Sequence, residues 1–187
     1  MSRERCLAEL KQEQAAKKGD LRMIALKIED LKTFTAQLFM GETFDYWLVR
    51  EANIVTFNSF TIDGRIRQGY YSDEELETNR IEELSSWKTL RPFCYSLIRG
   101  RKLPESFQIT LQLSPEENEK FIRRVKPDLP ADQIAALYLN IRYENHAAAC
   151  VTGTSLKIFM LDKQIEQEWD ETVRRYFRKL QIPYVEV

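Results

Sequence analysis

Apolar and polar residues alternate along several short stretches of the chain, and this period of two is typical of a half-buried β-strand. The alternation is cleanest over 106–114, "SFQITLQLS", where the apolar positions are Phe107, Ile109, Leu111 and Leu113. It recurs over 24–28, "IALKI". Both stretches therefore predict strands with one buried face.

Denser runs of β-branched and aromatic residues predict further strands. We expect two or three over 44–66, three over 134–143, 147–153 and 155–161, and a short final one in "IPYVEV". The turns are expected at Asp63-Gly64, at 144–146 and near Gly153, because Gly, Asn and Asp favour tight turns.

A period of three to four residues predicts helices between these strands. The expected helices lie over 2–18, 29–40, 72–87, 86–99, 115–125 and 162–180. Ser72 and Glu75 have the spacing of a capping box, and Ser114 with Pro115 is a typical helix start. The last helix carries one apolar stripe, formed by Ile165, Trp169, Val173, Phe177 and Leu180.

The same order of elements occurs twice, because a strand runs directly into a helix at Ile24 and again at Ile109. This predicts an α+β fold of two β-α-β-β(-β)-type halves, about 23–100 and 105–182, with a mostly antiparallel sheet and a clamp-like form. Strand-then-helix units are also common in ordinary α+β domains, so both interpretations stay open.

Residues 1–22 differ in character from the rest of the chain, since they are charged and poor in large apolar residues. We expect a loose N-terminal helix there and a single domain over 23–187. Lys18-Gly19-Asp20 can be encoded by a purine-rich ribosome-binding sequence just upstream of Met23. We therefore hypothesise that residues 1–22 are not native and that translation starts at Met23.

Several phrases carry a resemblance to known families, namely "MIALKIEDL", "FNSFTIDG", "LRPFC", "LIRG" and "FQITLQLSPEE". Over most of 23–122 the chain resembles an uncharacterised family of small bacterial proteins, which implies no particular activity. The two strand–helix openings also resemble DNA sliding-clamp domains. That second resemblance implies a ring-forming scaffold whose helices face DNA, yet the helix over 29–40 carries one cation, Lys32, and two acids.

Charge and composition narrow the class of protein. Lys plus Arg number 28 against 29 for Asp plus Glu, and the pI is about 6.0, which excludes a globally basic nucleic-acid binder. No apolar run is long enough to span a bilayer, and the N-terminus lacks the apolar core of a secretory signal. We therefore expect a cytoplasmic protein without a membrane partner.

Local clusters of cations could still contact nucleic acid or phosphate. The candidates follow helix ends or lie in last turns: Arg99, Arg101, Lys102, Arg123, Arg124, Arg174, Arg175, Arg178 and Lys179. Basic helix ends in corresponding places of the two halves would form one patch. The alternative is that these cations are solvated and stabilise the negative ends of their helices.

Candidate chemistry is sparse. The three cysteines, Cys6, Cys94 and Cys150, lack the paired spacing of a disulfide framework or zinc site, and His146 is expected in a turn. The sequence has no phosphate-binding glycine motif and no nucleophile elbow. We nominate no catalytic residue, metal or cofactor, and the interpretation leans against an enzyme.

These observations favour a non-enzymatic binding or scaffold module with a sliding-clamp-like fold. One alternative is an enzyme of unrecognised type that uses carboxylate, Tyr or Lys chemistry. Another is a peptide-binding module that uses the aromatic hairpin over 57–71. Protein and nucleic acid both stay open as partners, and self-association is compatible with the sequence.

Overall fold

The structure of the protein is a computed structural model that describes residues 23–187 apart from 68, 80, 131–132 and 158–162. The helix expected over 2–18 lies outside the described residues. The strands are β1 (Ala25–Ile28), β2 (Leu48–Val55), β3 (Ser59–Asp63), β4 (Ser106–Gln112), β5 (Ile134–Glu144), β6 (Ala147–Leu156) and β7 (Tyr184–Glu186). The helices are α2 (Leu31–Phe39), α3 (Asp73–Asn79), α4 (Trp87–Ile98), α5 (Pro115–Val125) and α6 (Gln164–Lys179).

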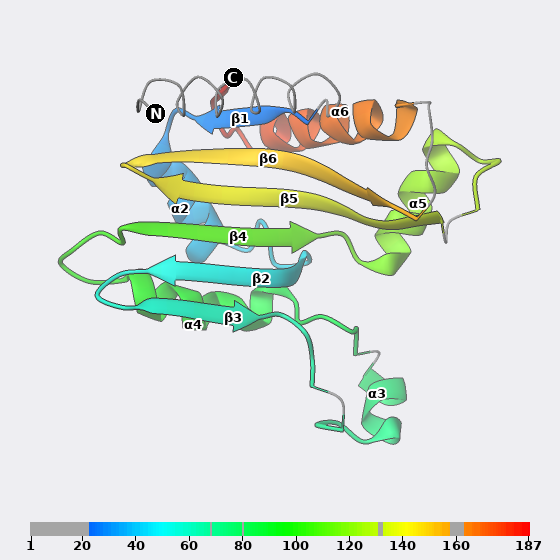
Figure 1. The fold of residues 1–187 in the computed structure, drawn as a ribbon, viewed down its shortest axis with the longest axis horizontal. Coiled ribbons are helices and arrows are strands. Elements are labelled where there is room, and N and C mark those ends of the chain that lie inside the picture. The colour runs from blue at the N-terminus through cyan, green and yellow to red at the C-terminus, as the bar shows by residue number, and fades with distance from the viewer. Residues whose placement is uncertain (1–22, 68, 80, 131–132, 158–162) are drawn as a thin grey trace, which may run out of the picture.

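All seven strands form one antiparallel sheet in the order β3-β2-β4-β5-β6-β1-β7 (Figure 1). The predicted α+β class with a mostly antiparallel sheet is therefore confirmed. Both expected strand–helix openings are present, as β1–α2 and as β4–α5. The two halves share the one sheet, because β1 pairs with β6 and β2 pairs with β4. The division into halves and the clamp-like form stay predictions.

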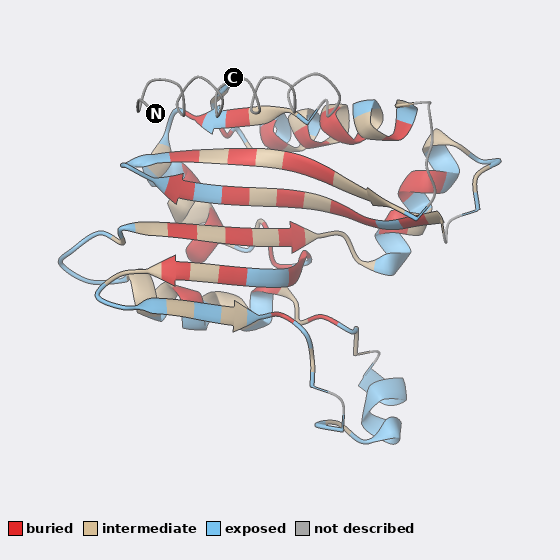
Figure 2. Ribbon diagram, in the orientation of Figure 1, coloured by how far each residue is buried: buried red, intermediate tan, exposed pale blue. Residues whose placement is uncertain are grey.

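One face of the sheet carries the hydrophobic core. Its register aligns Leu26, Cys150, Ile141, Ile109 and Ala52 across five neighbouring strands, and each of these side chains is fully buried. Helices α2, α4, α5 and α6 contribute to the same core cluster. Buried and partly exposed residues alternate along the strands in Figure 2, as the sequence pattern predicts.

The ends of the predicted helices are set by the expected capping residues. Ser114 caps α5 and accepts from the backbone N–H of Glu117 at 3.3 Å. Ser72 and Glu75 form the predicted capping box of α3, with exchanged bonds of 2.8 and 3.2 Å. The helix expected over 72–87 is shorter than predicted, because α3 ends at Asn79.

The β5–β6 hairpin turns at Asn145 and His146, whose φ angles are 52° and 60°. Two consecutive positive φ angles are typical of a type I′ turn, which matches the twist of the strands. His146 is exposed in that turn, so its expected role as a turn residue is confirmed.

Two glycines expected in turns have other roles. A Cβ on Gly64 would lie 1.7 Å from the carbonyl oxygen of Val49, so Gly64 serves a close backbone approach at the end of β3. The β2–β3 connection lies instead over 56–58. Gly153 pairs with Tyr138 inside β6, which continues to Leu156, so the turn predicted near Gly153 is wrong.

Candidate binding groove

A turn over 43–47 forms one wall of a cavity beside α5 and α6, and two contacts from distant parts of the chain hold this turn in place. Asp45 is 5% exposed, and its carboxylate makes a two-point ion pair with Arg91 of α4 at 3.0 and 3.2 Å. The hydroxyl of Tyr176 on α6 donates to the carbonyl of Thr43 at 2.5 Å. The turn is therefore anchored to both α4 and α6.

Aromatic rings line this cavity, which has a volume of about 650 Å³ and lies between the 43–47 turn, α5 and α6. The ring of Trp47 lies 6.0 Å from that of Trp169 and 5.9 Å from that of Tyr176. Phe121 of α5 meets Trp169 edge to face at 5.7 Å. Tyr46 also lines the cavity and is 91% exposed, so an aromatic side chain stands free there.

A second, shallower cavity of about 890 Å³ continues along the two helices. It shares Glu117, Arg124, Thr172 and Tyr176 with the first cavity. We call the two together the α5–α6 groove. One end of the groove is rich in aromatic rings, and the other is polar.

The groove carries more positive than negative charge. Its lining includes four cations against two carboxylates: Lys120, Arg124, Arg175 and Lys179 against Glu117 and Glu168. Lys120 pairs with Glu117 at 2.8 Å and also with Glu116, and these bonds raise the pKa of its ammonium group. Arg175 pairs with Glu168 at 2.8 Å. Within the described part of the chain no ion pair is formed by Arg124 or Lys179, so these two residues contribute the excess positive charge of the groove.

Arg124 lies where the two cavities meet. Its guanidinium is 5.4 Å from the ring centre of Phe121, and it donates to the hydroxyl of Thr172 at 3.4 Å. Among the residues that the structure describes, no carboxylate forms an ion pair with Arg124. A guanidinium beside an aromatic wall and without a carboxylate partner can receive an anionic group in a two-point contact.

The predicted phosphate-contacting residues divide into three sets. Arg124, Arg175 and Lys179 line the groove. Arg123, Arg174 and Arg178 face carboxylates of their own or neighbouring elements, namely Glu119, Glu171 and Glu186.

The third set lies apart from the groove. Arg99, Arg101 and Lys102 follow α4 on the β3 side of the sheet, whereas α6 packs beside β6 (Figure 1). The two sets of basic helix ends expected to form one patch therefore lie beside different strands. Their contact with nucleic acid or phosphate stays a prediction.

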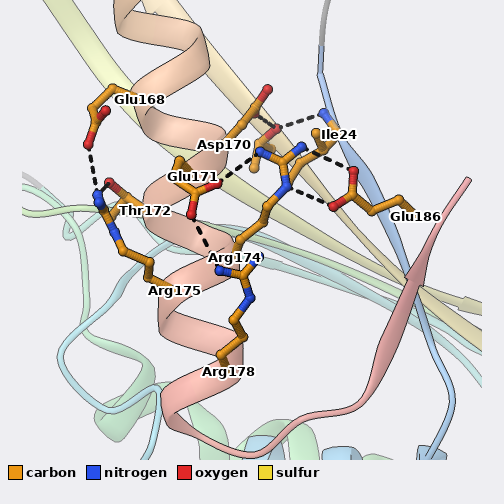
Figure 3. A network of polar contacts seen from close by, with 10 residues as sticks. Ile24, Glu168, Asp170, Glu171, Thr172, Arg174, Arg175, Arg178 and Glu186 are labelled. Atoms are coloured by element: carbon orange, nitrogen blue, oxygen red, sulfur yellow. Dashed lines mark hydrogen bonds and ion pairs between the residues drawn. The ribbon is translucent and has the colours of Figure 1, made fainter.

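A buried carboxylate on the other side of α6 stabilises the sheet. Thr152 of β6 donates to Asp170 at 2.5 Å and accepts from the backbone N–H of Ile24 at 3.2 Å. Burial raises the pKa of the Asp170 carboxyl, against the opposing effects of Thr152 and Arg174. Figure 3 shows Asp170 beside Ile24. The carboxylate thus connects α6 to the start of β1.

Several other charged residues of α6 form a network of ion pairs. Arg174 contacts Glu186 of β7 at 2.8 and 3.1 Å, and it also reaches Glu171 (Figure 3). These bonds raise the pKa of Arg174 and lower the pKa of Glu186. The network stabilises the edge strand β7 against the helix.

The nucleophilic groups of the core are shielded. Burial raises the pKa of the Cys94 thiol to about 12, and it raises the pKa of Cys150 as well. Burial also raises the pKa of Tyr176, whose hydroxyl contacts Thr43 and Trp47. In the described part of the chain, no group of three His, Cys, Asp or Glu side chains could hold a metal ion.

Sequence reasoning places some of the groove residues and misses others. Trp169 belongs to the predicted buried stripe of the last helix, and it is 2% exposed. Trp47 falls in a predicted strand, but β2 begins at Leu48. Phe121 and Arg124 are three residues apart, and that spacing on one helix face is the available signal for a cation beside a ring.

The residues 37–185 match the model of a family of unknown function, DUF5721. The match covers most of the chain, so the protein belongs to this family, and the expected resemblance to an uncharacterised family is confirmed. No curated protein and no solved structure matches the chain. Within the described residues, no helix has the length and apolar character needed to cross a membrane.

Proposed function

We propose that the protein is a binding module whose α5–α6 groove accepts a protein segment with aromatic or apolar side chains next to acidic ones. The observation that carries the proposal is Arg124, a guanidinium on an aromatic wall that faces no carboxylate among the described residues. The aromatic end supplies apolar contact area, and Arg124 supplies a site for a carboxylate. Such a pairing recognises both parts of one segment.

The residue types of the groove support a protein as the ligand. Trp, Tyr and Arg are the side chains that most often dominate the energy of protein interfaces. Here Trp47, Tyr46 and Arg124 line one continuous groove, and Tyr46 is almost fully exposed. Because the 43–47 turn is anchored by Asp45 and Tyr176, little ordering would be needed on binding.

Other functions have less support. A nucleic-acid surface would need cations that are free to contact phosphates, yet Arg123, Arg174 and Arg178 already face carboxylates. Catalysis by Tyr or Lys would need a side chain that is not already engaged in a hydrogen bond or ion pair. Tyr176 donates a hydrogen bond to Thr43, and Lys120 forms an ion pair with Glu117. A clamp-like assembly, a bacterial source and a cytoplasmic location stay predictions from the sequence.

The test is a titration of the full chain with fluorescein-labelled peptides. One peptide carries tyrosines and leucine among acidic residues, a second replaces the acids by lysine, and a third replaces the apolar residues by alanine. We expect only the first to bind, because only it satisfies both ends of the groove. Binding of none, or equal binding of all three, would contradict the proposal.

A matched pair of variants sharpens this test. Arg124→Ala removes the groove guanidinium, and we expect it to weaken binding of the first peptide roughly tenfold or more. Arg123→Ala removes the neighbouring cation, which pairs with Glu119 and lies outside the groove lining. Binding by Arg123→Ala should stay near that of the parent chain, and equal losses in both variants would refute the role of Arg124.

A further inference from the structure

An arm of the chain stands off the sheet between β3 and α4. Its base is an isolated antiparallel β-bridge between Arg65 and Leu84, next to which the N–H of Ile66 donates to the carbonyl of Glu83 at 2.9 Å. Its tip carries α3, none of whose residues is buried. Figures 1 and 2 show α3 away from the sheet and exposed along its length.

A helix of this length has little stability of its own. It has seven residues, and isolated helices shorter than roughly 12–15 residues are marginal in water. The Ser72–Glu75 capping box supports only its first turn. A helix that buries no residue against the described part of its own chain gains more stability by packing against another molecule.

The arm tip has the composition that the α5–α6 groove is proposed to accept. Residues 70–79, "YYSDEELETN", contain four acids and no cation. Tyr70 is 74% exposed and Leu76 is 37% exposed, so apolar side chains stand beside the acids. Tyr70 and Tyr71 meet edge to face at 4.9 Å, which presents two rings together.

The base of the arm adjoins the 43–47 wall of the groove in the same copy, because the N–H of Trp87 donates to the carbonyl of Trp47, but the tip of the arm lies away from α5 and α6. The arm leaves the sheet at its β3 edge, whereas α5 contacts β5 and α6 contacts β6, three or more strands away in the sheet order. Figure 1 shows the arm directed away from α5 and α6. A second copy of the chain can bring its arm to the groove without any change within either copy.

We propose that the arm tip, residues 70–79, docks in the α5–α6 groove of a second copy of this chain. The inference rests on the proposed function, because it names the segment that the groove accepts. The tyrosines and Leu76 occupy the aromatic end, and the acids of α3 face Arg124 and Lys179. Charge complementarity between an acidic tip and a groove of net positive lining supports this occupant.

The contact joins two different surfaces, so once it forms, one copy still offers its groove and the other still offers its arm. Such a heterologous contact either closes reciprocally between two copies or continues into a larger assembly. Both results give a mass of at least twice the 22.2 kDa of one copy. Screening by salt weakens the contact, because part of it is electrostatic.

The test measures the mass of the full chain by light scattering on a sizing column, over a range of protein and salt concentrations. We expect a dimer or larger species that dissociates as salt rises or protein is diluted. Two charge reversals, Arg124→Glu in the groove and Glu74→Arg with Glu77→Arg in the arm, should each give monomers. Glu74 and Glu77 lie outside the capping box, so α3 keeps its cap.

Mixing the two monomeric variants should restore a dimer or larger species, because the reversed charges are again complementary. A variant that fails through misfolding cannot be rescued in this way. The parent chain staying monomeric at high concentration would overturn the inference, as would assembly that survives both reversals. If the parent is monomeric and the acidic aromatic peptide still binds, only the self-docking fails; if neither occurs, the proposed function fails too.

Discussion

Helices α3 and α6 are both rich in charged residues, yet different contacts stabilise them. Helix α6 has 16 residues and buries Ile165, Trp169, Asp170, Val173 and Phe177 against the sheet. Helix α3 has seven residues and buries none. The comparison shows that the fold stabilises α6 through its core, whereas α3 is held mainly by its cap and by the base of its arm.

The largest effect should come from removing a core ring of α6. We expect Trp169→Ala to lower the free energy of unfolding by about 3–5 kcal/mol, because it leaves a cavity between Phe121 and Trp47. The measurement is urea denaturation followed by circular dichroism. Leu76→Ala on α3 is the matched control and should be near neutral, and similar losses in both variants would contradict the comparison.

A smaller effect is expected at the residue where the sheet ends and the arm begins. Gly64→Ala places a Cβ against the backbone of Val49, and we expect a loss of about 1–3 kcal/mol from the forced displacement. Gly100→Ala is the control, because a Cβ there would meet no atom within 4 Å. Thermal unfolding of both variants measures the difference. An unfolding temperature of Gly64→Ala equal to that of the parent would show that the backbone at the base of the arm can shift without loss of stability.

The buried carboxyl of α6 should affect how stability changes with pH. Because burial raises the folded-state pKa of Asp170 above its usual 3.8, the folded chain holds that proton more strongly than the unfolded chain. The resulting stability is fully present below pH 3.8 and is lost as pH rises through the folded pKa. Asparagine has no ionisable carboxyl group, so Asp170→Asn removes this contribution to the pH dependence of stability.

The measurement is the free energy of unfolding of the parent and of Asp170→Asn at several pH values upward from pH 3.8. The parent should lose stability relative to the variant as pH rises. A difference that stays constant would show that Asp170 keeps an ordinary pKa, and one that moves the other way would show a lowered pKa; either result would contradict the prediction.

The smallest global effect is expected at the α3 cap. Ser72→Ala removes the two hydrogen bonds between the Ser72 hydroxyl and Glu75, yet we expect almost no change in the free energy of unfolding, because α3 contributes nothing to the core. Hydrogen exchange of the α3 amides should nevertheless become faster. A global loss comparable with that of a core substitution would mean that the arm is part of the cooperative unit.

Elements with strong periodicity were predictable from the sequence. The alternation over 107–111 placed β4, and the apolar stripe from Ile165 to Phe177 placed α6, because a single buried face imposes a regular spacing. The capping residues Ser72 and Ser114 were predictable for a similar reason, since their bonds are local.

The groove was not predictable in the same way, because distant contacts form it. The 43–47 turn contains Phe44, Tyr46 and Trp47, whose types favour strands, so local propensity indicated a strand there. The ion pair of Asp45 with Arg91 and the bond from Tyr176 to Thr43 override that propensity. Nothing in the local spacing of these residues indicates either contact.

The position of β1 in the sheet has a consequence for how the chain folds during its synthesis. Its neighbours are β6 and β7, so Lys27 must wait for Ala149, about 120 residues later. At roughly 5–20 residues per second, the ribosome needs about 6–25 s to deliver that partner. Throughout this interval β1 lacks both of its neighbouring strands, whereas α2 can already pack against Phe44 and Trp87. The first strand of the sheet is therefore among the last to be paired.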